Sequence, residues 1–452
     1  MTAGGPLPRR PLRRAGAAPV ALLLLAAAPA SPYAPLRSFL SSSALSGSGL
    51  SELAPDLVPG LVDALFFLPK TRRAEAVAAL EAATGERPGE RYHDWVELVA
   101  RRTDLKPAPG YAAWKGELFA RIDPRYREIF RPDAPARIRL EEIVWGGVPL
   151  EGIPALDRPA SVPAGRASWM RDGERVFGVR LRGEARAYPL RIVGWHEMVN
   201  DVVGGEPVTL SYCTLCGSGV LFSAPRLTFG TSGLLYRSNK LMVDRQTGTL
   251  WSNLTGEPVL GRLALDPEPL RVLPLTLTTW KDWRARHPET TVLDLDPARA
   301  ARWGYDYTPG AADRKREGVS FPAGPPAPGG LDGKAEVFAV RLGRFARAYE
   351  MEALLRERVV HDRLGEQDLV VVADPESGAA RAYRSGGRTF VPGARPDELV
   401  DGSGARWVAG DESLAPAGPG TLAPLERIPG HQAFWFGWYA FFPDSALYRG
   451  KQ

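Results

Sequence analysis

The chain contains two cysteines, and both lie in one short motif. Cys213 and Cys216 are separated by two residues and are followed by Gly217. Two thiols at this spacing can act as a redox dithiol, supply half of a tetrahedral metal site, or close a structural disulfide. A disulfide across so short a loop contributes only about 2 kcal/mol on the chain-entropy estimate. The motif alone leaves these three alternatives open.

One histidine and two acidic residues precede this motif. His196 stands seventeen residues before Cys213 and is followed directly by Glu197. The pair begins like the H-E-x-x-H helix of zinc proteins, but Asn200 stands where the second histidine is required. We predict His196 as a third metal ligand or a proton partner of the thiols. Glu197 and Asp201 are the candidate catalytic acids or bases.

A long internal repeat relates the two halves of the chain. Residues 176–188 and 337–349 are identical at 9 of 13 positions, with a shift of 161. The same shift aligns Asp201 with Asp362. Near the end of each copy, a Trp-x-x-Trp pair begins at Trp280 and at Trp435. Features that both copies share are expected to serve the fold.

The chemistry-bearing residues differ between the copies. Asp374 and Ser377 replace the two cysteines in the second copy, and His361 replaces Asn200. If the copies face each other, His361 and His196 can approach the two thiols. Two thiolates and two imidazoles would suit a transition metal, zinc or copper. The sequence thus predicts a metal site of Cys213, Cys216, His196 and His361, or a redox pair of the cysteines alone.

Hydrophobic periodicity predicts the elements that carry these residues. Residues 52–137 have apolar side chains at helical spacing and predict a helical region. From residue 138 onward, short alternating runs separated by Gly and Pro predict strands. We therefore expect an α+β fold, with copy one at 138–300 and copy two at 301–452. The duplicated unit should be mostly antiparallel, with a pseudo-two-fold relation between its copies.

The first thirty residues have the pattern of a secretory signal peptide. Four arginines precede an apolar stretch, and Ala28-Pro29-Ala30 offers small residues for cleavage. Residues 31–51 are rich in Ser, Pro and Gly and predict a flexible linker. The formal charge of +5 falls to about +1 without the four arginines. We therefore expect an exported, periplasmic or extracellular protein with no nucleic-acid partner, tethered to a membrane only if the signal segment is not cleaved.

Several motifs together resemble the exported proteins of domain-of-unknown-function family 3179. They are IVWGGVPLEGIPAL at 143–156, HEMVND at 196–201 and SYCTLCGSG at 211–219. The resemblance continues through copy two to Tyr448. It implies an exported bacterial or archaeal setting and no particular activity.

The sequence leaves three hypotheses about function. The first is a metal-binding or thiol-redox protein centred on Cys213 and Cys216, with His196. The second is a non-catalytic binding module whose cysteine pair is a structural disulfide. The third is a metal-assisted hydrolase that uses Glu197. None of the motifs predicts a substrate or a protein partner.

Overall fold

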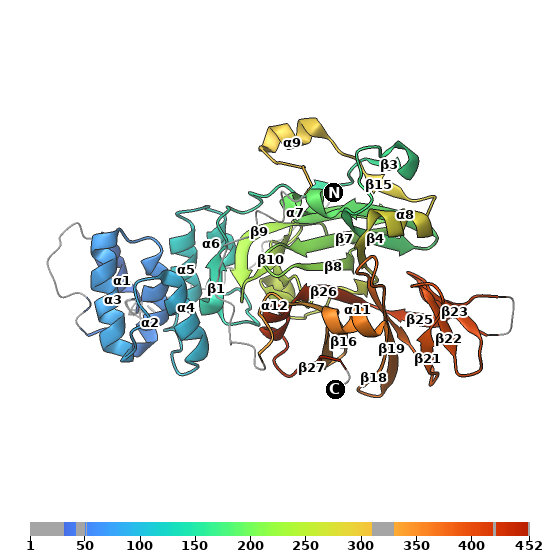
Figure 1. Ribbon diagram of the computed structural model, residues 1–452. Coiled ribbons are helices and arrows are strands. Elements are labelled where there is room, and N and C mark those ends of the chain that lie inside the picture. The colour runs from blue at the N-terminus through green and yellow to red at the C-terminus, as the bar shows by residue number, and fades with distance from the viewer. Residues whose placement is uncertain (1–30, 42–49, 51, 310–329, 419–421, 451–452) are drawn as a thin grey trace, which may run out of the picture.

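The computed structural model describes residues 31–41, 50, 52–309, 330–418 and 422–450. The signal peptide expected over residues 1–30 lies outside this part of the chain. Helices come first and are followed by several sheets in which most strand pairs are antiparallel, so the α+β prediction is confirmed (Figure 1). Within the described residues, no helix has both the length and the apolar character needed to cross a membrane.

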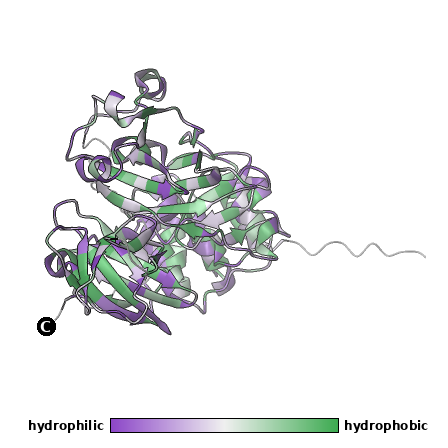
Figure 2. Ribbon diagram, turned by 90° about the vertical axis from the view of Figure 1, so that its right-hand side faces the viewer, coloured by the Kyte–Doolittle hydropathy of each residue, from purple (hydrophilic) through white to green (hydrophobic). Residues whose placement is uncertain are grey.

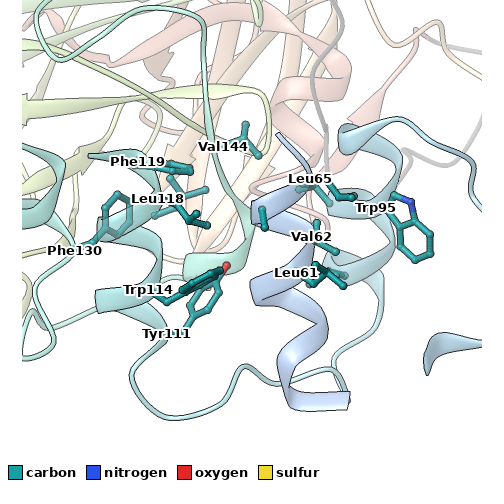
Figure 3. Packing of buried hydrophobic residues seen from close by; sticks show 14 of the residues in the cluster. Leu61, Val62, Leu65, Trp95, Tyr111, Trp114, Leu118, Phe119, Phe130 and Val144 are labelled. Carbon is teal, nitrogen blue, oxygen red and sulfur yellow. The ribbon is translucent and has the colours of Figure 1, made fainter. Parts of the chain in front are cut away.

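The N-terminal region is a bundle of short helices. Its core includes Leu61 of α2, Trp95 of α4 and Trp114 of α5, and Figure 3 shows the two tryptophans on opposite sides of α2. The helices are α1 (Ala34–Ser41), α2 (Val58–Leu65), α3 (Lys70–Thr84), α4 (Tyr92–Arg101), α5 (Tyr111–Phe119) and α6 (Tyr126–Ile129).

The prediction of a flexible linker is wrong for residues 34–41. This segment forms α1, and its Leu36 and Phe39 are buried in the helical core. Apolar residues at positions 36 and 39 lie on one face of a helix, and burial of that face offsets the poor helix propensity of the neighbouring serines.

A five-stranded sheet of copy one packs against the helical region. Its strands are β1 (Ile143–Trp145), β9 (Phe229–Tyr236), β10 (Asn239–Asp244), β11 (Leu250–Ser252) and β12 (Pro258–Leu260), which pair in the order β1-β9-β10-β11-β12. Leu234 and Leu235 of β9 belong to the same hydrophobic core as the helices. The β9–β10 hairpin is therefore fixed from the helical side.

The rest of copy one forms two further five-stranded sheets. Its strands are β2 (Leu156–Asp157), β3 (Ser161–Pro163), β4 (Arg175–Leu181), β5 (Glu184–Pro189), β6 (Met198–Val203), β7 (Glu206–Cys213), β8 (Ser218–Ser223), β13 (Val272–Leu273), β14 (Thr276–Thr279) and β15 (Thr291–Leu293); its helices are α7 (Leu190–His196), α8 (Trp280–Arg286) and α9 (Pro297–Trp303). The strand orders are β14-β4-β5-β15-β3 and β13-β8-β7-β6-β2.

Copy two repeats this order of elements. It contains β16 (Glu336–Leu342), β17 (Phe345–Glu350), α11 (Met351–Glu357), β18 (Val359–Leu364), β19 (Gln367–Ala373), β20 (Ala380–Arg384), β21 (Phe390–Pro392), β22 (Glu398–Asp401), β23 (Arg406–Ala409), β24 (Ser413–Pro416), β25 (Leu425–Ile428), β26 (Gly430–Phe434), α12 (Trp435–Tyr439) and β27 (Ala446–Tyr448). Its four-stranded sheet β26-β16-β17-β27 corresponds to β14-β4-β5-β15 of copy one. Hydrophobic residues occupy much of these strands, whereas the outer loops are mainly hydrophilic (Figure 2).

The shared acidic positions support the fold in both copies. Asp201 accepts hydrogen bonds from Arg186 at 2.7 Å and from the Tyr188 hydroxyl at 2.8 Å. Asp362 of copy two accepts the equivalent bonds, from its own arginine at 2.7 Å and its own tyrosine at 2.9 Å. Because the two copies use the same arrangement, it belongs to the fold and gives Asp201 no role peculiar to copy one.

The second sheet of copy two is nearly closed. Its eight strands have the order β18-β19-β20-β25-β24-β23-β22-β21, and the end strands β18 and β21 lie next to each other. His361 of β18 accepts a hydrogen bond from the backbone N–H of Phe390 in β21 at 2.8 Å. The two rings stack with their centres 6.3 Å apart. His361 thus links the two edges of this sheet.

A buried charge cluster joins the two copies. Asp411 of copy two accepts hydrogen bonds from Thr276 of β14 at 2.7 Å and from His287 of copy one at 2.9 Å. Arg286 of α8 also donates to it, as does Arg381 of β20 at 2.8 Å. One carboxylate therefore holds cationic side chains from both copies at their boundary.

Candidate thiol site

The two cysteines lie in a tight turn between β7 and β8 of copy one. β7 ends at Cys213, and β8 begins at Ser218. We call residues 213–217 the cysteine turn. Gly217 closes it with φ of +59°, a conformation that glycine adopts at little cost. Both cysteines are free thiols with exposed fractions of 1% for Cys213 and 0% for Cys216.

The equivalent turn of copy two holds a carboxylate. Asp374 stands at the position of Cys213, and Ser377 stands at the position of Cys216. The Asp374 carboxylate accepts the N–H of Glu376 at 2.8 Å and the Ser377 hydroxyl at 2.6 Å. This backbone shape therefore directs hydrogen-bond donors toward an anion at the first position of the turn.

The same arrangement governs the protonation of the two thiols. Burial and the charge of Glu197 disfavour the Cys213 thiolate. Hydrogen bonds from the Cys216 thiol and from the backbone N–H groups of Cys216 and Lys240 outweigh both, so the pKa of Cys213 lies below its usual value. The pKa of Cys216 is raised well above its usual value by burial and by the hydrogen bond it gives to Cys213. Of the two thiols, Cys213 is therefore the first to lose its proton as the pH rises.

A carbonyl from the β9–β10 hairpin faces both thiols. The Ser238 oxygen lies 3.3 Å from Cys216 Sγ and 3.7 Å from Cys213 Sγ. Arg237 and Ser238 form the hairpin turn with φ of +50° and +61°, although neither is glycine. Such strained conformations persist when the surroundings hold them, and they gather at functional sites. Here Arg237 donates to Glu142 and to the Ala440 carbonyl, both at 2.7 Å.

Copy two closes the site from the other side. The N–H of Phe434 donates to the Cys216 carbonyl at 2.7 Å. Gly437 of α12 packs so tightly on Cys216 that an added Cβ would lie 2.8 Å from its sulfur. The cysteine turn therefore depends on both copies, although only copy one supplies its thiols.

A mainly apolar pocket of about 430 Å³ reaches Cys213. Cys213 contributes to its wall, whereas Cys216 does not. The apolar part of the wall comes from β9, β10, the end of α7 and the segment around α9, through Leu234, Leu235, Leu241, Trp195, Trp303 and Tyr305. Among the described residues, Cys213 is therefore the member of the thiol pair that lines this pocket.

The charged and polar side chains of the pocket interact with one another. The ammonium of Lys240 donates to the backbone oxygen of Glu197 at 2.6 Å and lies 3.9 Å from its carboxylate. The Thr214 hydroxyl donates to the same carboxylate at 3.1 Å. Glu197 adopts φ of +59° because it ends α7, as Arg358 ends α11 in copy two with φ of +63°. The fold sets this backbone conformation, and the acidic side chain is particular to copy one.

The predicted histidine ligands are not gathered around the cysteines. The His196 ring bonds to the Pro154 carbonyl at 2.7 Å and to the hydroxyl of Tyr307. His361 lies at the edge of the eight-stranded sheet of copy two. Across the described ranges, no group of three or more His, Cys, Asp or Glu side chains could hold a metal ion. The four-ligand metal site stays a prediction.

Of the predicted residues, the structure brings together Cys213, Cys216 and Glu197. Sequence reasoning missed Lys240 and Ser238, which come from the neighbouring hairpin. The repeat offers a partial signal for the turn itself, because Asp374 and Ser377 occupy the equivalent positions in copy two.

Comparison with known proteins identifies the family of this chain. Residues 150–445 match the family model described as "Protein of unknown function (DUF3179)". The matched range includes the cysteine turn and most of copy two. No curated protein and no solved structure matches the chain.

Proposed function

Because the chain belongs to the DUF3179 family, whose description names no activity, its chemistry must be inferred from its own site, and we propose that it is a thiol-redox protein. In this proposal Cys213 and Cys216 interconvert between a dithiol and a disulfide. Cys213 is the attacking thiolate, and Cys216 is the thiol that resolves the intermediate.

The observation that carries the proposal is the unequal environment of the two thiols. The turn directs donors toward Cys213 as the equivalent turn does toward Asp374, and the pKa of Cys213 is lowered as a result. A thiolate is the reactive form of cysteine, and a lowered pKa raises its population near neutral pH. Cys213 also lines the pocket, whereas Cys216 does not.

The reaction needs only these two side chains. The Cys213 thiolate attacks an oxidising substrate in the pocket and forms a covalent intermediate. The Cys216 thiol then loses its proton and attacks the Cys213 sulfur, which releases the reduced substrate and forms the disulfide. Two electrons leave the protein, and its two thiol protons pass to the products.

Metal binding is the other part of the original hypothesis. A third protein ligand is needed for the structural and catalytic zinc sites known in proteins. In the described part of the chain, no other His, Asp or Glu completes such a set with the thiols. A zinc or copper site of Cys213, Cys216, His196 and His361 stays a prediction, and elemental analysis of the purified protein tests it.

A redox titration tests the proposal directly. The full chain is equilibrated in buffers of reduced and oxidised dithiothreitol, quenched with acid, denatured and alkylated, and its free thiols are counted by mass spectrometry. We expect both thiols to disappear together and to return on reduction. In Cys213→Ser and in Cys216→Ser, the single remaining thiol should stay free in every buffer. Two thiols that never pair, or a bound metal that is lost in Cys213→Ser, would overturn the proposal.

A further inference from the structure

We propose that the substrate of Cys213 is an apolar organic hydroperoxide that binds in the pocket beside it. This inference rests on the proposed redox function of the two thiols and adds the class of oxidant. Its three supports are the access to the sulfur, the charge of the pocket and the composition of the pocket wall.

Access to the sulfur limits the shape of the substrate. Cys213 is 1% exposed, and it lines a pocket of about 430 Å³ that leads to its sulfur. A disulfide on the surface of a folded protein cannot enter such a space. A quinone must present the face of its ring to a thiolate, whereas a hydroperoxide presents a terminal oxygen. The terminal oxygen of a hydroperoxide can reach the Cys213 sulfur although little of that sulfur is accessible.

The charge of the pocket favours a neutral substrate. The charge of Lys240 is matched by the Glu197 carboxylate 3.9 Å away, and Thr214 further satisfies that carboxylate. A charged oxidant such as glutathione disulfide would bring several carboxylates into a site whose described lining has Lys240 as its cation, and Lys240 is already paired with Glu197. Burial of a charge without a partner is costly, so the pocket discriminates against such molecules.

The wall of the pocket favours an apolar body with a ring. Trp195 and Tyr305 stack with their ring centres 5.0 Å apart, and Trp303 lies beside them on the wall. Leu234 and Leu241 line it from strands β9 and β10. Ligand pockets of this kind hold mainly apolar molecules through buried area and use a few polar groups for orientation.

The chemistry balances with the two thiols alone. The Cys213 thiolate attacks the terminal oxygen of ROOH; an S–O bond forms and the O–O bond breaks. The alkoxide takes up the proton that Cys213 gave up on ionising and leaves as ROH. Cys216 then attacks the sulfenic sulfur, and its proton leaves with the hydroxyl group as water. The hydroperoxide is reduced by two electrons, and the dithiol becomes a disulfide.

A single-turnover comparison of oxidants tests the inference. Reduced full-length protein is mixed with cumene hydroperoxide, hydrogen peroxide or glutathione disulfide, and loss of free thiol is followed in time. Substrate discrimination by an apolar wall is worth about tenfold or more in rate. We therefore expect cumene hydroperoxide to react at least about tenfold faster than hydrogen peroxide, and glutathione disulfide to react slowest.

Matched variants tie the preference to the pocket. Tyr305→Ala removes part of the aromatic wall and should lower the ratio of the cumene hydroperoxide rate to the hydrogen peroxide rate about tenfold. Phe345→Ala removes an aromatic ring from copy two that is 40% exposed and should leave the ratio unchanged. Equal rates for the two peroxides, or a faster reaction with glutathione disulfide, would overturn the inference. If dithiothreitol buffers still form the Cys213–Cys216 disulfide, the redox function survives that result.

Discussion

The buried charge cluster between the copies provides a sharp test of what holds the duplicated fold together. Asp411 receives hydrogen bonds from Arg381 at 2.8 Å, from Thr276 at 2.7 Å and from His287 at 2.9 Å, and Arg286 contacts it as well. Replacement by Asn keeps the size of the side chain and removes its charge. The arginines would then be buried without their shared anion.

The expected cost follows from this geometry. Breaking a buried ion pair on one side costs about 3–5 kcal/mol, because an uncompensated charge is left behind. The free energy of unfolding of a whole domain is only about 5–15 kcal/mol. We therefore expect Asp411→Asn to lower the free energy of unfolding by about 4 kcal/mol. Urea denaturation followed by tryptophan fluorescence measures this change, since Trp280 and Trp283 are buried in α8, the helix that contributes Arg286.

A neighbouring acid supplies the control. Glu412 is 42% exposed and pairs with Arg180 at 3.1 Å. Surface pairs of this kind contribute about 0–1 kcal/mol, so Glu412→Gln should be nearly neutral. If Asp411→Asn costs less than about 1 kcal/mol, the buried-charge reasoning is wrong.

The pH dependence of the Asp411 contribution has a definite sign. Burial raises the pKa of this carboxyl, but the charges of Arg381 and Arg286 outweigh burial and hold the pKa well below its usual range. A depressed pKa contributes stability that is fully present above the unfolded value of about 3.9 and is lost as the pH falls through the folded pKa. The Asp411 contribution should therefore stay constant from neutral pH down to about pH 5.

Three further changes probe the cysteine turn and the eight-stranded sheet. Cys216→Ala removes a donor to the Cys213 sulfur, so alkylation of Cys213 by iodoacetamide should move to higher pH; an unchanged pH profile would contradict the assigned hydrogen bond. Gly437→Ala places a methyl group against Cys216 and should cost about 1–3 kcal/mol in urea denaturation, while the variant still folds. His361→Ala removes the acceptor at the edge of the eight-stranded sheet and should cost about 1 kcal/mol; faster hydrogen exchange of the paired amide would report the opening, and full protection would refute it.

The repeat in the sequence predicted much of the β-rich fold. The hairpin of β4 and β5 reappears as β16 and β17 at a shift of 161 residues, because most strand residues are identical and each turn contains a glycine. The linker prediction failed at α1 because composition cannot reveal that Leu36 has a hydrophobic partner surface elsewhere. Composition and periodicity report the properties of one segment, whereas the burial of that segment depends on residues far away in the sequence that pack against it.

The candidate site was predicted only in its local part. The two cysteines and Glu197 follow from neighbouring segments, and all three lie at the site. His196 was predicted as a ligand because its spacing from Cys213 is suggestive, but its bonds to Pro154 and Tyr307 come from segments that no spacing rule connects. The pocket is likewise assembled from β9, β10 and the α9 segment, and contacts between such distant segments are not encoded in any single motif.

The closure of the cysteine turn by copy two has a consequence for the newly made chain. Arg237, which holds the Ser238 turn in place, donates to Ala440, 203 positions later in the sequence. At roughly 5–20 residues per second, synthesis of that stretch takes on the order of 10–40 s. Throughout this interval the thiols lack the cover that α12 and Phe434 provide. The two cysteines are therefore synthesised well before the residues of copy two that cover them. A factor that binds or protects thiols in the newly made chain can act during this interval.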